Sequence, residues 1–236
     1  MEDFSIKPYE IKKIQKILET KEVEELIECL KTFEIHAKSI GEGGNAEILA
    51  IEEGPFSKVC LKKVKETPQL VYNTIDRENE LQGKAHKAGV RTPLALLSIE
   101  TESGDEFFLM EKIDGINVEE ALAQPSKVPD AFSNEPFMKD LDDQIKKMHN
   151  AGIYHRDLHV RNVMIDKAGQ PVIIDFGTAV EGTGSDFTYE ELATVYDEKK
   201  KGYTQVSGKF QDDLKMVRNL RSAIIPLARR KLDKVE

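Results

Sequence analysis

The sequence predicts an α+β protein in two parts, an antiparallel sheet with one inserted helix and then a mostly helical region. In the first half, short β-type runs are separated by glycine-containing turns, as in a strand meander. In the second half, apolar residues recur with helical spacing. Hydrophobic residues make up 39% of the 236 residues, which is enough for a sizeable core and argues against disorder.

Residues 9–32 are predicted to form a helix, and residues 1–32 an N-terminal helical extension. One apolar stripe on this helix has the spacing i, i+3, i+4, i+7; it consists of Val23, Leu26, Ile27 and Leu30. The stripe predicts a helix docked on the main body. The alternative is a helix that binds a partner protein.

The sheet is predicted to have five antiparallel strands. They are expected at 33–40, 46–52, 56–64, 94–100 and 106–112. Turns at 41–44 and 53–55 separate the first three, and a helix over 69–88 is inserted after the third strand. Residues 33–112 therefore form the predicted first domain.

Residues 113–236 form the predicted second domain. Helices are expected at 117–123, 137–150 and 209–234, the last interrupted by Pro226. The proline-containing segment 124–136 is expected to be a loop, and two short strands are expected at 163–166 and 171–175. The polar segment 178–208 shows no strong period.

Charge and composition exclude several classes of function. The net charge of −9 argues against a nucleic-acid partner, because binding phosphate backbones requires clustered positive charge. Cys29 and Cys60 have neither metal-ligand spacing nor the number of a disulfide framework, so a reduced, cytoplasmic setting is expected. No signal pattern is present, and no apolar run reaches the roughly 20 residues of a membrane span.

Four local motifs occur in order along the chain. The first is the glycine-rich turn with Gly41, Gly43 and Gly44, where backbone N–H groups can approach phosphate oxygens closely. The second is Lys62, which ends the apolar run V-C-L-K and shares a strand face with Cys60. Each of these two motifs alone is also compatible with an ordinary turn or a solvated lysine.

The third motif is H-R-D-L-H-V-R-N over residues 155–162, between a predicted helix and a strand. Its spacing lets Asp157 and Asn162 reach one site from a single loop. The fourth motif is V-I-I-D-F-G over 172–177, in which Asp175 ends an apolar strand. A buried aspartate is costly unless it is paired, and a magnesium ion would compensate for it.

Together these motifs resemble the protein-kinase signature set: glycine loop, V-A-I-K strand, H-R-D-x-x-x-x-N loop and D-F-G. The resemblance covers residues 35 to 180 and implies a bilobal protein-kinase-like fold with ATP and Mg²⁺ as cofactors. It implies that Gly41, Gly43, Gly44 and Lys62 bind the phosphates. It assigns the catalytic base to Asp157 and the magnesium ligands to Asn162 and Asp175.

The resemblance implies further roles. Met110 would lie beside the adenine, and the backbone from Glu111 to Ile113 would form the hinge that binds the base. Glu78 is the expected acidic partner of Lys62, with Glu80 as the alternative. Asp212 or Asp213 is expected to anchor the catalytic loop. Thr183, Ser185 and Thr188 are candidate autophosphorylation sites by position.

Some residues depart from the family pattern. Ala46 stands where the loop has its third glycine, and His159 stands where serine/threonine kinases have a lysine. No A-P-E segment follows Asp175. This shortened C-lobe resembles RIO-type kinases, lipopolysaccharide-core kinases and the small effector kinases of bacterial pathogens, in which case the cytoplasm could be that of a host.

The resemblance implies an ATP-dependent protein serine/threonine kinase that acts on a protein substrate. Two alternatives stay open. One is a kinase acting on the hydroxyl of a sugar, lipid or antibiotic. The other is a non-enzymatic scaffold, against which the intact set of Lys62, Asp157, Asn162 and Asp175 argues.

Overall fold

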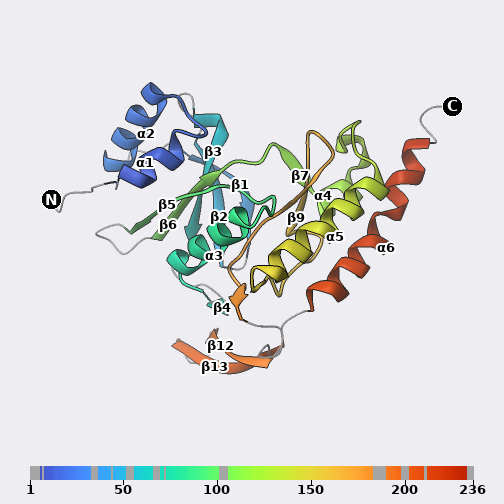
Figure 1. The fold of residues 1–236 in the computed structure, drawn as a ribbon. Coiled ribbons are helices and arrows are strands. Elements are labelled where there is room, and N and C mark those ends of the chain that lie inside the picture. Colours follow the sequence, from blue (N-terminus) through green and yellow to red (C-terminus); the bar gives the residue numbers. More distant parts are fainter. Residues whose placement is uncertain are drawn as a thin grey trace. The chain divides into compact units, whose positions relative to one another are not determined.

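In the computed structural model the chain forms two compact units (Figure 1). The structure describes residues 6, 8–32, 37–43, 45–51, 56–65, 70–71, 73–100, 106–182, 190–197, 202–209 and 212–232. The first unit comprises 1–71, 94–112 and 194–204, and the second comprises 72–93, 113–193 and 205–236. The boundaries predicted at residues 32 and 112 stay a prediction. Gly44, the turn at 53–55, residues 33–36 and the three candidate autophosphorylation sites lie outside the described residues.

The first unit contains the predicted five-stranded antiparallel sheet, which confirms the fold class. The strand order is β1-β2-β3-β6-β5. The strands are β1 (Ala37–Glu42), β2 (Ala46–Ile51), β3 (Val59–Val64), β5 (Ala95–Glu100) and β6 (Glu106–Glu111). A single 3-10 turn, η1 (Phe56–Lys58), replaces the start of the predicted third strand. The central position of β3 places Lys62 between two hydrogen-bonded neighbours.

The single helix predicted over 9–32 is wrong in one respect, because the chain forms two helices there. They are α1 (Pro8–Ile14) and α2 (Thr20–Thr32). The Glu19 N–H donates to the Glu22 carboxylate at 2.8 Å, half of a capping box that starts a new helix. Periodicity could not locate this break, since the apolar spacing continues through it.

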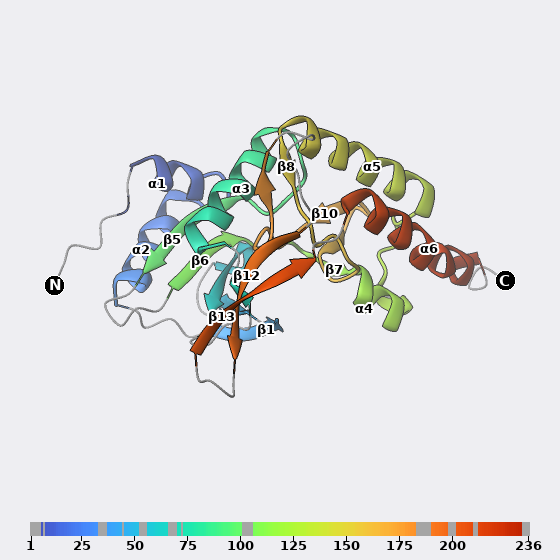
Figure 2. The same cartoon turned by 90° about the horizontal axis from the view of Figure 1, so that it is seen from below.

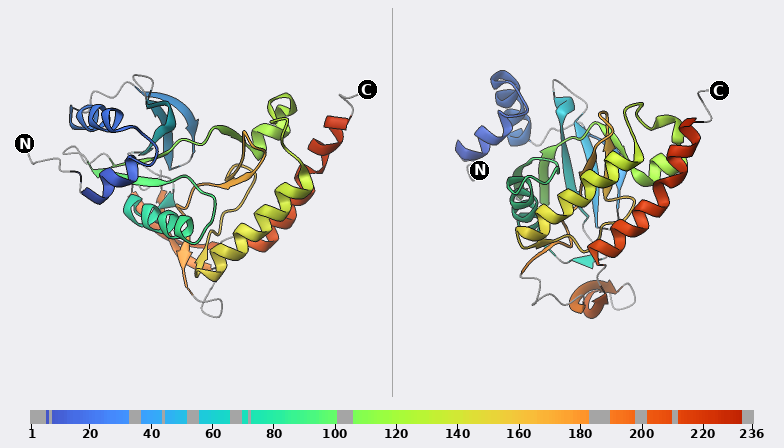
Figure 3. Two further views of the ribbon diagram at one scale, coloured as in Figure 1. Left: turned by 45° about the horizontal axis from the view of Figure 1, so that its top comes forward. Right: turned by 45° about the vertical axis from the view of Figure 1, so that its right-hand side comes forward.

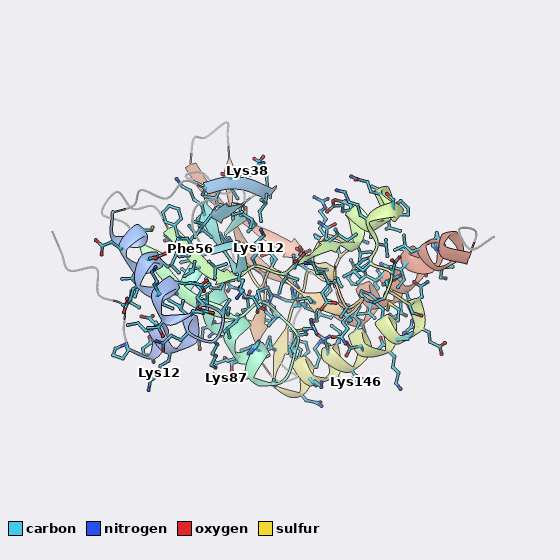
Figure 4. All side chains as sticks on the ribbon, turned by 90° about the horizontal axis from the view of Figure 1, so that it is seen from above. Lys12, Lys38, Phe56, Lys87, Lys112 and Lys146 are labelled. Carbon is cyan, nitrogen blue, oxygen red and sulfur yellow. The ribbon has the colours of Figure 1, made fainter. Side chains whose placement is uncertain are left out.

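The two N-terminal helices share one apolar core with the sheet. Ile14 and Leu26 are 0% exposed, and they lie in the same cluster as Leu61, Leu96 and Leu109 of the strands. Phe56, labelled in Figure 4, belongs to this cluster too. Figures 1 and 2 both show α1 next to β5, with which it makes contacts. In the described part of the stripe, Val23 and Leu26 thus belong to this core and Ile27 packs against it, as expected for a docked helix.

The second unit combines helices with short strands. Its helices are α3 (Ile75–Lys87), α4 (Val118–Ala123), η2 (Pro125–Lys127), α5 (Asn134–Asn150) and α6 (Asp213–Leu232). Its short strands are β7 (Gly115–Asn117), β8 (Ile153–Tyr154), β9 (Val163–Asp166), β10 (Pro171–Ile173) and β11 (Val180–Glu181). The sheet orders are β10-β9-β7 and β11-β8. Helices α5 and α6 lie side by side (Figure 3).

One apolar core holds this unit together. It joins α5, through Leu141, Ile145 and Met148, to α6, through Leu220 and Ile224. The remaining members from the strands and loops include Leu158, Val163, Ile165, Ile173 and Phe176. The strands β8 and β9, which flank the loop 155–162, are therefore held in place by this core.

Two local predictions for this region are wrong. Pro226 does not interrupt the last helix but lies exposed inside α6, whose buried residues Ile224 and Leu227 keep packing on either side of it. The inserted helix begins at Ile75, where Thr74 caps it, rather than at 69. The segment 178–208, which shows no period, forms β11, β12 (Glu190–Asp197) and part of β13 (Gly202–Lys209).

Strands β13, β12 and the two-residue β4 (Leu70–Val71) form a further sheet in that order. Thr194 and Val195 of β12 pair with Val71 and Leu70. Pairing with a strand more than 100 positions earlier leaves no local sequence signal, which explains why this sheet was not predicted. No helix in the described part of the chain is long and apolar enough to cross a membrane.

Truncating Leu26 should destabilise the protein through the N-terminal helices. Leu26→Ala leaves a cavity where a side chain is 0% exposed, and we expect a loss of about 2 to 5 kcal/mol in the free energy of unfolding. Glu24→Ala, on the exposed side of the same helix, is the control and should change stability by less than about 0.5 kcal/mol. Urea denaturation followed by circular dichroism measures both. Equal stability of the two variants would contradict the shared core.

Candidate active site

The loop 155–162 brings Asp157 and Asn162 into direct contact. The Asn162 side-chain amide donates to the Asp157 carbonyl oxygen at 2.9 Å and to its Oδ2 at 3.0 Å. Two backbone bonds tighten the loop, from His159 N to Asp157 O and from Asn162 N to His159 O, each at 2.9 Å. Asn162 is only 6% exposed, so the carboxylate is held by a side chain that is itself fixed.

Asp175 reaches the same loop from the end of β10. The backbone N–H of Ile174 donates to the carbonyl of Asn162 at 3.0 Å, which ties the two segments together. Asp175 has a φ of +65°, in the left-handed region that a non-glycine residue rarely adopts. Its Oδ1 accepts a hydrogen bond from Gly177 N at 3.3 Å. Strain of this kind persists where the surroundings impose it, commonly at active sites.

The pKa of the Asp157 carboxyl lies above its usual value of 3.8. Burial is the main cause, because it disfavours the charged form, and the nearby Asp175 carboxylate adds to the rise. The rings of His159 and His155 and the amide of Asn162 act in the opposite direction. Asp157 and Asp175 are therefore two carboxylates close enough to repel each other.

A buried carboxylate anchors the loop from beneath. Asp213, the first residue of α6, accepts the backbone N–H groups of His155 and Arg156, each at 2.8 Å. His149 Nε2 lies 3.0 Å from the same carboxylate and its ring stacks on Tyr154. Asp213 is 2% exposed, and hydrogen bonds of this charge-assisted type offset the cost of burying it. Of the two predicted anchors, Asp213 and not Asp212 makes these contacts.

This anchor stabilises a strained backbone. Arg156 has a φ of +66°, the second non-glycine residue with positive φ among those described. Besides its bond to Asp213, its Nε donates to the carbonyl of Thr178 at 2.7 Å, and the Thr178 hydroxyl donates to the His155 carbonyl at 3.0 Å. Arg156 is 3% exposed, so its charged group is turned inward. The orientation of Asp157, the next residue, depends on this arrangement.

His155 acts as a packing residue in the structure. It is 0% exposed, and its ring meets that of Phe176 edge to face at 5.0 Å. Nδ1 accepts the N–H of Asp157 at 3.3 Å, and Nε2 lies 2.9 Å from the carbonyl of Ile174. Since Nδ1 accepts, the ring donates from Nε2. His155 thereby links both acidic residues of the site.

The residues present fit a divalent cation that is shared with a ligand. Two carboxylates that repel each other and one amide oxygen are the oxygen ligands that Mg²⁺ prefers. Within the described residues, no group of three or more His, Cys, Asp or Glu side chains is arranged to hold a metal ion. Besides carboxylate oxygens, a cation here would therefore need other ligands, namely the Asn162 amide oxygen, water or oxygens of a bound ligand.

The other predicted site residues of the sheet lie on β3 and β6. Lys62 is 9% exposed and lies between Ile48 and Phe108 on the neighbouring strands. Cys60 pairs with Met110, and burial raises the pKa of its thiol to about 12, so the thiol stays neutral. The amides of Glu111 and Lys112 donate to the carbonyls of Leu94 and Lys58. Ile113, the next residue, belongs to the second unit.

The glycines of the turn are not required by the packing of the chain itself. A Cβ atom built at Gly41 would meet Ile48 at 3.8 Å, and one at Gly43 would meet the Ala46 carbonyl at 3.6 Å. Both are ordinary contact distances. Gly43 N–H donates to the same carbonyl at 2.9 Å, which closes the hairpin. A side chain at either position would therefore make ordinary contacts with the described chain and no clash.

The two acidic candidates for the partner of Lys62 lie on helix α3, one on its buried face and one on its exposed face. Glu78 is 5% exposed, whereas Glu80 lies on the exposed face and forms ion pairs with Arg77 and Lys84. Arg77 and Lys84 also pair with Glu181 of β11, and the Asn73 amide donates to the carbonyls of Phe176 and Ala179. The helix that carries Glu78 is thus tied to the segment after Asp175.

Sequence reasoning missed His149 and Asn73. Their partners are 64 and 103 positions away, respectively, and neither residue belongs to a local motif. A lone histidine near the end of a helix and an asparagine before one give no signal by themselves. The joint placement of Lys62 with Asp157 and Asp175 stays a prediction.

Removing the anchor should weaken the whole second unit. Asp213→Ala leaves two buried amide donors without their acceptor, and we expect a loss of about 2 to 4 kcal/mol in the free energy of unfolding. The control is Asp143→Ala, whose carboxylate forms an exposed pair with Lys146 on α5 (Lys146 is labelled in Figure 4). That change should cost less than about 1 kcal/mol. Thermal and urea denaturation would measure both, and similar losses would refute the anchor.

Neutralising Asp157 should stabilise the unliganded protein. The raised pKa means that ionising Asp157 costs more free energy in the folded chain than in the unfolded chain. At a pH above that pKa this cost destabilises the fold, and Asp157→Asn removes it. The asparagine oxygen can still accept from Asn162. We expect the melting temperature at pH 7 to rise by about 1 to 4 °C. The gain should shrink as the pH falls through the raised pKa; a fall in melting temperature at pH 7 would contradict the electrostatic strain.

The family model described as "protein kinase domain" matches residues 35–196. Hormonally up-regulated neu tumor-associated kinase of Mus musculus is 26% identical over 148 residues, which cover 61% of this chain and 20% of that protein. Serine/threonine-protein kinase PknD of Chlamydia trachomatis serovar D is 25% identical over 190 residues, 71% of this chain and 20% of that protein.

Serine/threonine-protein kinase PKH3 of Eremothecium gossypii is 28% identical over 131 residues, 55% of this chain and 18% of that protein. The chain thus spans about a fifth of the length of these curated relatives. The match to the family model extends over more than half of the chain and takes in the glycine turn, Lys62, the 155–162 loop and Asp175. The predicted superfamily is confirmed: this chain belongs to the protein kinase domain family.

Proposed function

We propose that this chain is an ATP-dependent protein serine/threonine kinase that transfers the γ-phosphoryl group to a hydroxyl with the help of Mg²⁺. The observation that carries the proposal is the grouping of Asp157, Asn162 and Asp175 around one strained, anchored loop. Membership in the protein kinase domain family supports the same chemistry. Phosphoryl transfer depends mainly on positioning and charge neutralisation, which is what such a rigid polar site supplies.

Asp157 is the proposed catalytic base. One carboxylate oxygen is held by Asn162, which orients the other toward an incoming hydroxyl. A carboxyl whose pKa is raised accepts a proton more readily than an ordinary aspartate, provided that it is ionised at the working pH. The anchor at Asp213 and the inward-turned Arg156 keep the loop from relaxing when the proton moves.

Asn162 and Asp175 are the proposed magnesium ligands. Bound Mg²⁺ would neutralise the charge of the phosphates and of the acidic pair. Asn162 is buried and fixed, while Asp175 is exposed on a backbone that holds its carboxylate in place.

Lys62 is the proposed phosphate-binding lysine, with the glycine turn of Gly41, Gly43 and Gly44 above the phosphates. Its burial in the central strand β3 supports this assignment, and so does the finding that the packing of the described chain does not require glycine at positions 41 and 43. We propose Glu78 rather than Glu80 as its partner, because Glu78 is buried and Glu80 already pairs with Arg77 and Lys84.

The adenine is proposed to lie beside Met110 and the neutral Cys60. The carbonyl of Glu111 and the backbone of Ile113 are the proposed hydrogen-bonding groups of the hinge. The amides of Glu111 and Lys112 are not proposed as donors, since they already donate to Leu94 and Lys58. We propose residues 33–112 and 113–236 as the two lobes around this nucleotide.

The acceptor is proposed to be a protein, as the names of the serine/threonine kinases among the relatives indicate. The acidic stretch 130–143 could attract a cationic small molecule, but two of its carboxylates, Asp142 and Asp143, already pair with Arg221 and Lys146. A protein partner at the N-terminal helices, the atypical small-kinase subtype and a cytoplasmic setting remain predictions.

Asp157→Asn should abolish transfer without preventing nucleotide binding. Loss of the base should lower kcat by about 100-fold or more, while the dissociation constant of Mg-ATP stays within about threefold of wild type. Labelled ATP with dephosphorylated casein as acceptor measures transfer, and calorimetric titration measures binding. Asp143→Asn is the matched control and should keep full activity.

Two outcomes would contradict the proposal. Turnover of Asp157→Asn equal to that of wild type would remove Asp157 from the role of base. Transfer from labelled ATP to sugars or aminoglycosides but not to casein would replace the protein acceptor with a small molecule. In either case mass spectrometry of the acceptor identifies the phosphorylated atom.

A further inference from the structure

The chain makes a closed turn directly after Asp175. The Ala179 N–H donates to the Phe176 carbonyl at 3.0 Å, which closes the turn. Within it, the Gly177 N–H donates to Asp175 Oδ1 at 3.3 Å, so the backbone of the turn holds one oxygen of the proposed magnesium ligand. Asp175 itself has the unfavourable φ of +65°. The position of its carboxylate therefore depends on the contacts that keep this turn in place.

The loop 155–162 holds the middle of the turn. Arg156 Nε donates to the Thr178 carbonyl at 2.7 Å, and the Thr178 hydroxyl donates to the His155 carbonyl at 3.0 Å. These bonds do not involve the carbonyl groups at the two ends of the turn. The two end residues are at most 1% exposed, and buried carbonyl groups require a hydrogen-bond donor.

Asn73, two residues before helix α3, supplies a donor to both ends. Its side-chain amide donates to the Ala179 carbonyl at 2.9 Å and to the Phe176 carbonyl at 3.2 Å. One amide group thus bridges the first and the last residue of the turn. Asn73 and the turn belong to the same compact unit of the chain, so this contact is internal to the second unit.

Helix α3 makes a second set of contacts with the segment that follows the turn. Arg77 and Lys84 pair with Glu181 at 3.3 and 2.7 Å. All three side chains are between 36% and 39% exposed, and solvent weakens ion pairs of this kind. The amide of Asn73 is instead partly buried, and it donates directly to the main chain of the turn. Of these described contacts, the Asn73 amide therefore has the stronger influence on the geometry of the turn.

We propose that Asn73 is a positioning residue of the kinase site, which fixes the Asp175 carboxylate for cation binding by bridging the two ends of the turn 176–179. This inference rests on the proposed function, in which Asp175 is a magnesium ligand. Groups that hold a metal-binding carboxylate raise the affinity for the metal, because a ligand that is already in place loses less freedom on binding. The residue before the cap of helix α3 would thereby act on the cation site.

The test uses two substitutions of Asn73 and one matched control. Asn73→Asp keeps the shape of the side chain but replaces the amide donor by a carboxylate, which repels the two carbonyl oxygens. Its negative charge near the N-terminus of α3 favours the helix, so helix stability is not lost. Asn73→Ala only removes the amide. The control, Thr74→Ala, removes the cap that accepts the Arg77 N–H; it weakens the start of the helix and keeps the Asn73 amide.

Hydrogen exchange in the unliganded protein tests the contact itself. In both Asn73 variants the Ala179 N–H should exchange about tenfold faster or more, because the turn that it closes opens more often. In Thr74→Ala its exchange rate should stay within about twofold of wild type.

Cation binding tests the consequence without catalytic turnover. Mn²⁺ accepts the same oxygen ligands as Mg²⁺, and water proton relaxation reports the Mn²⁺ that is bound to the protein. With ADP present, the dissociation constant of Mn²⁺ should rise about tenfold in Asn73→Asp, and by a smaller factor in Asn73→Ala. Thr74→Ala should bind Mn²⁺ as wild type does.

Transfer to dephosphorylated casein tests the effect on the proposed reaction. The Mg²⁺ concentration that gives half of the maximal rate should rise about tenfold in Asn73→Asp, and excess Mg²⁺ should restore kcat to within about threefold of wild type. Excess cation compensates for a misplaced ligand, whereas it does not repair a general loss of folding. Thr74→Ala should keep the Mg²⁺ dependence of wild type.

Three results would overturn the role of Asn73. They are wild-type affinity for Mn²⁺ in both Asn73 variants, an equal loss of affinity in Thr74→Ala, and a loss of rate that excess Mg²⁺ does not restore. Each leaves the kinase function standing, provided that wild type is active and Asp157→Asn is not. A wild-type protein that binds Mn²⁺ but transfers no phosphate would instead remove the proposed function, and one that binds no Mn²⁺ would remove both.

Discussion

The geometry of the site depends on one buried carboxylate. Asp213 lies at the first turn of α6, where the helix dipole favours negative charge, and it accepts the main-chain amides of His155 and Arg156. These contacts offset the unfavourable backbone of Arg156 and so determine where Asp157 lies. The Leu220 and Ile224 side chains hold α6 on α5, so the main core of the second unit fixes the position of the anchor. The packing of α6 on α5 thus determines the orientation of the Asp157 carboxylate.

In the unliganded protein the carboxylates of this site repel each other. Burial raises the free-energy cost of ionising Asp157, and the Asp175 carboxylate adds to that cost. A protein selected only for stability would not keep this arrangement. The strain in the backbone of Asp175 has the same implication, and under the proposed function both costs would be offset by a bound cation and a phosphate ligand.

Much of this could be predicted from the sequence because the motifs are short and local. The spacing within 155–162 indicates that Asp157 and Asn162 share a site, and the resemblance to the kinase motifs adds Asp175. The sheet was predicted from short β-type runs between glycine-containing turns. What could not be predicted depends on distant partners or on local backbone geometry. His149 meets Asp213 across 64 positions, β12 pairs with β4 across more than 100, and the break between α1 and α2 depends on a capping contact within a continuous apolar stripe. Pro226 shows the reverse case, in which a strong local signal for a break is outweighed by the packing of its neighbours.

The helices α1 and α2 precede the region that the kinase family model matches, which begins at residue 35. Their buried leucines and isoleucines nevertheless complete the core behind β3, β5 and β6. A fragment that begins at residue 35 would therefore expose apolar residues of the sheet to water, and it would be prone to self-association. For this chain the folded core of the first unit and the region that the family model matches are different lengths of polypeptide, and a stable fragment should keep residues 8–32.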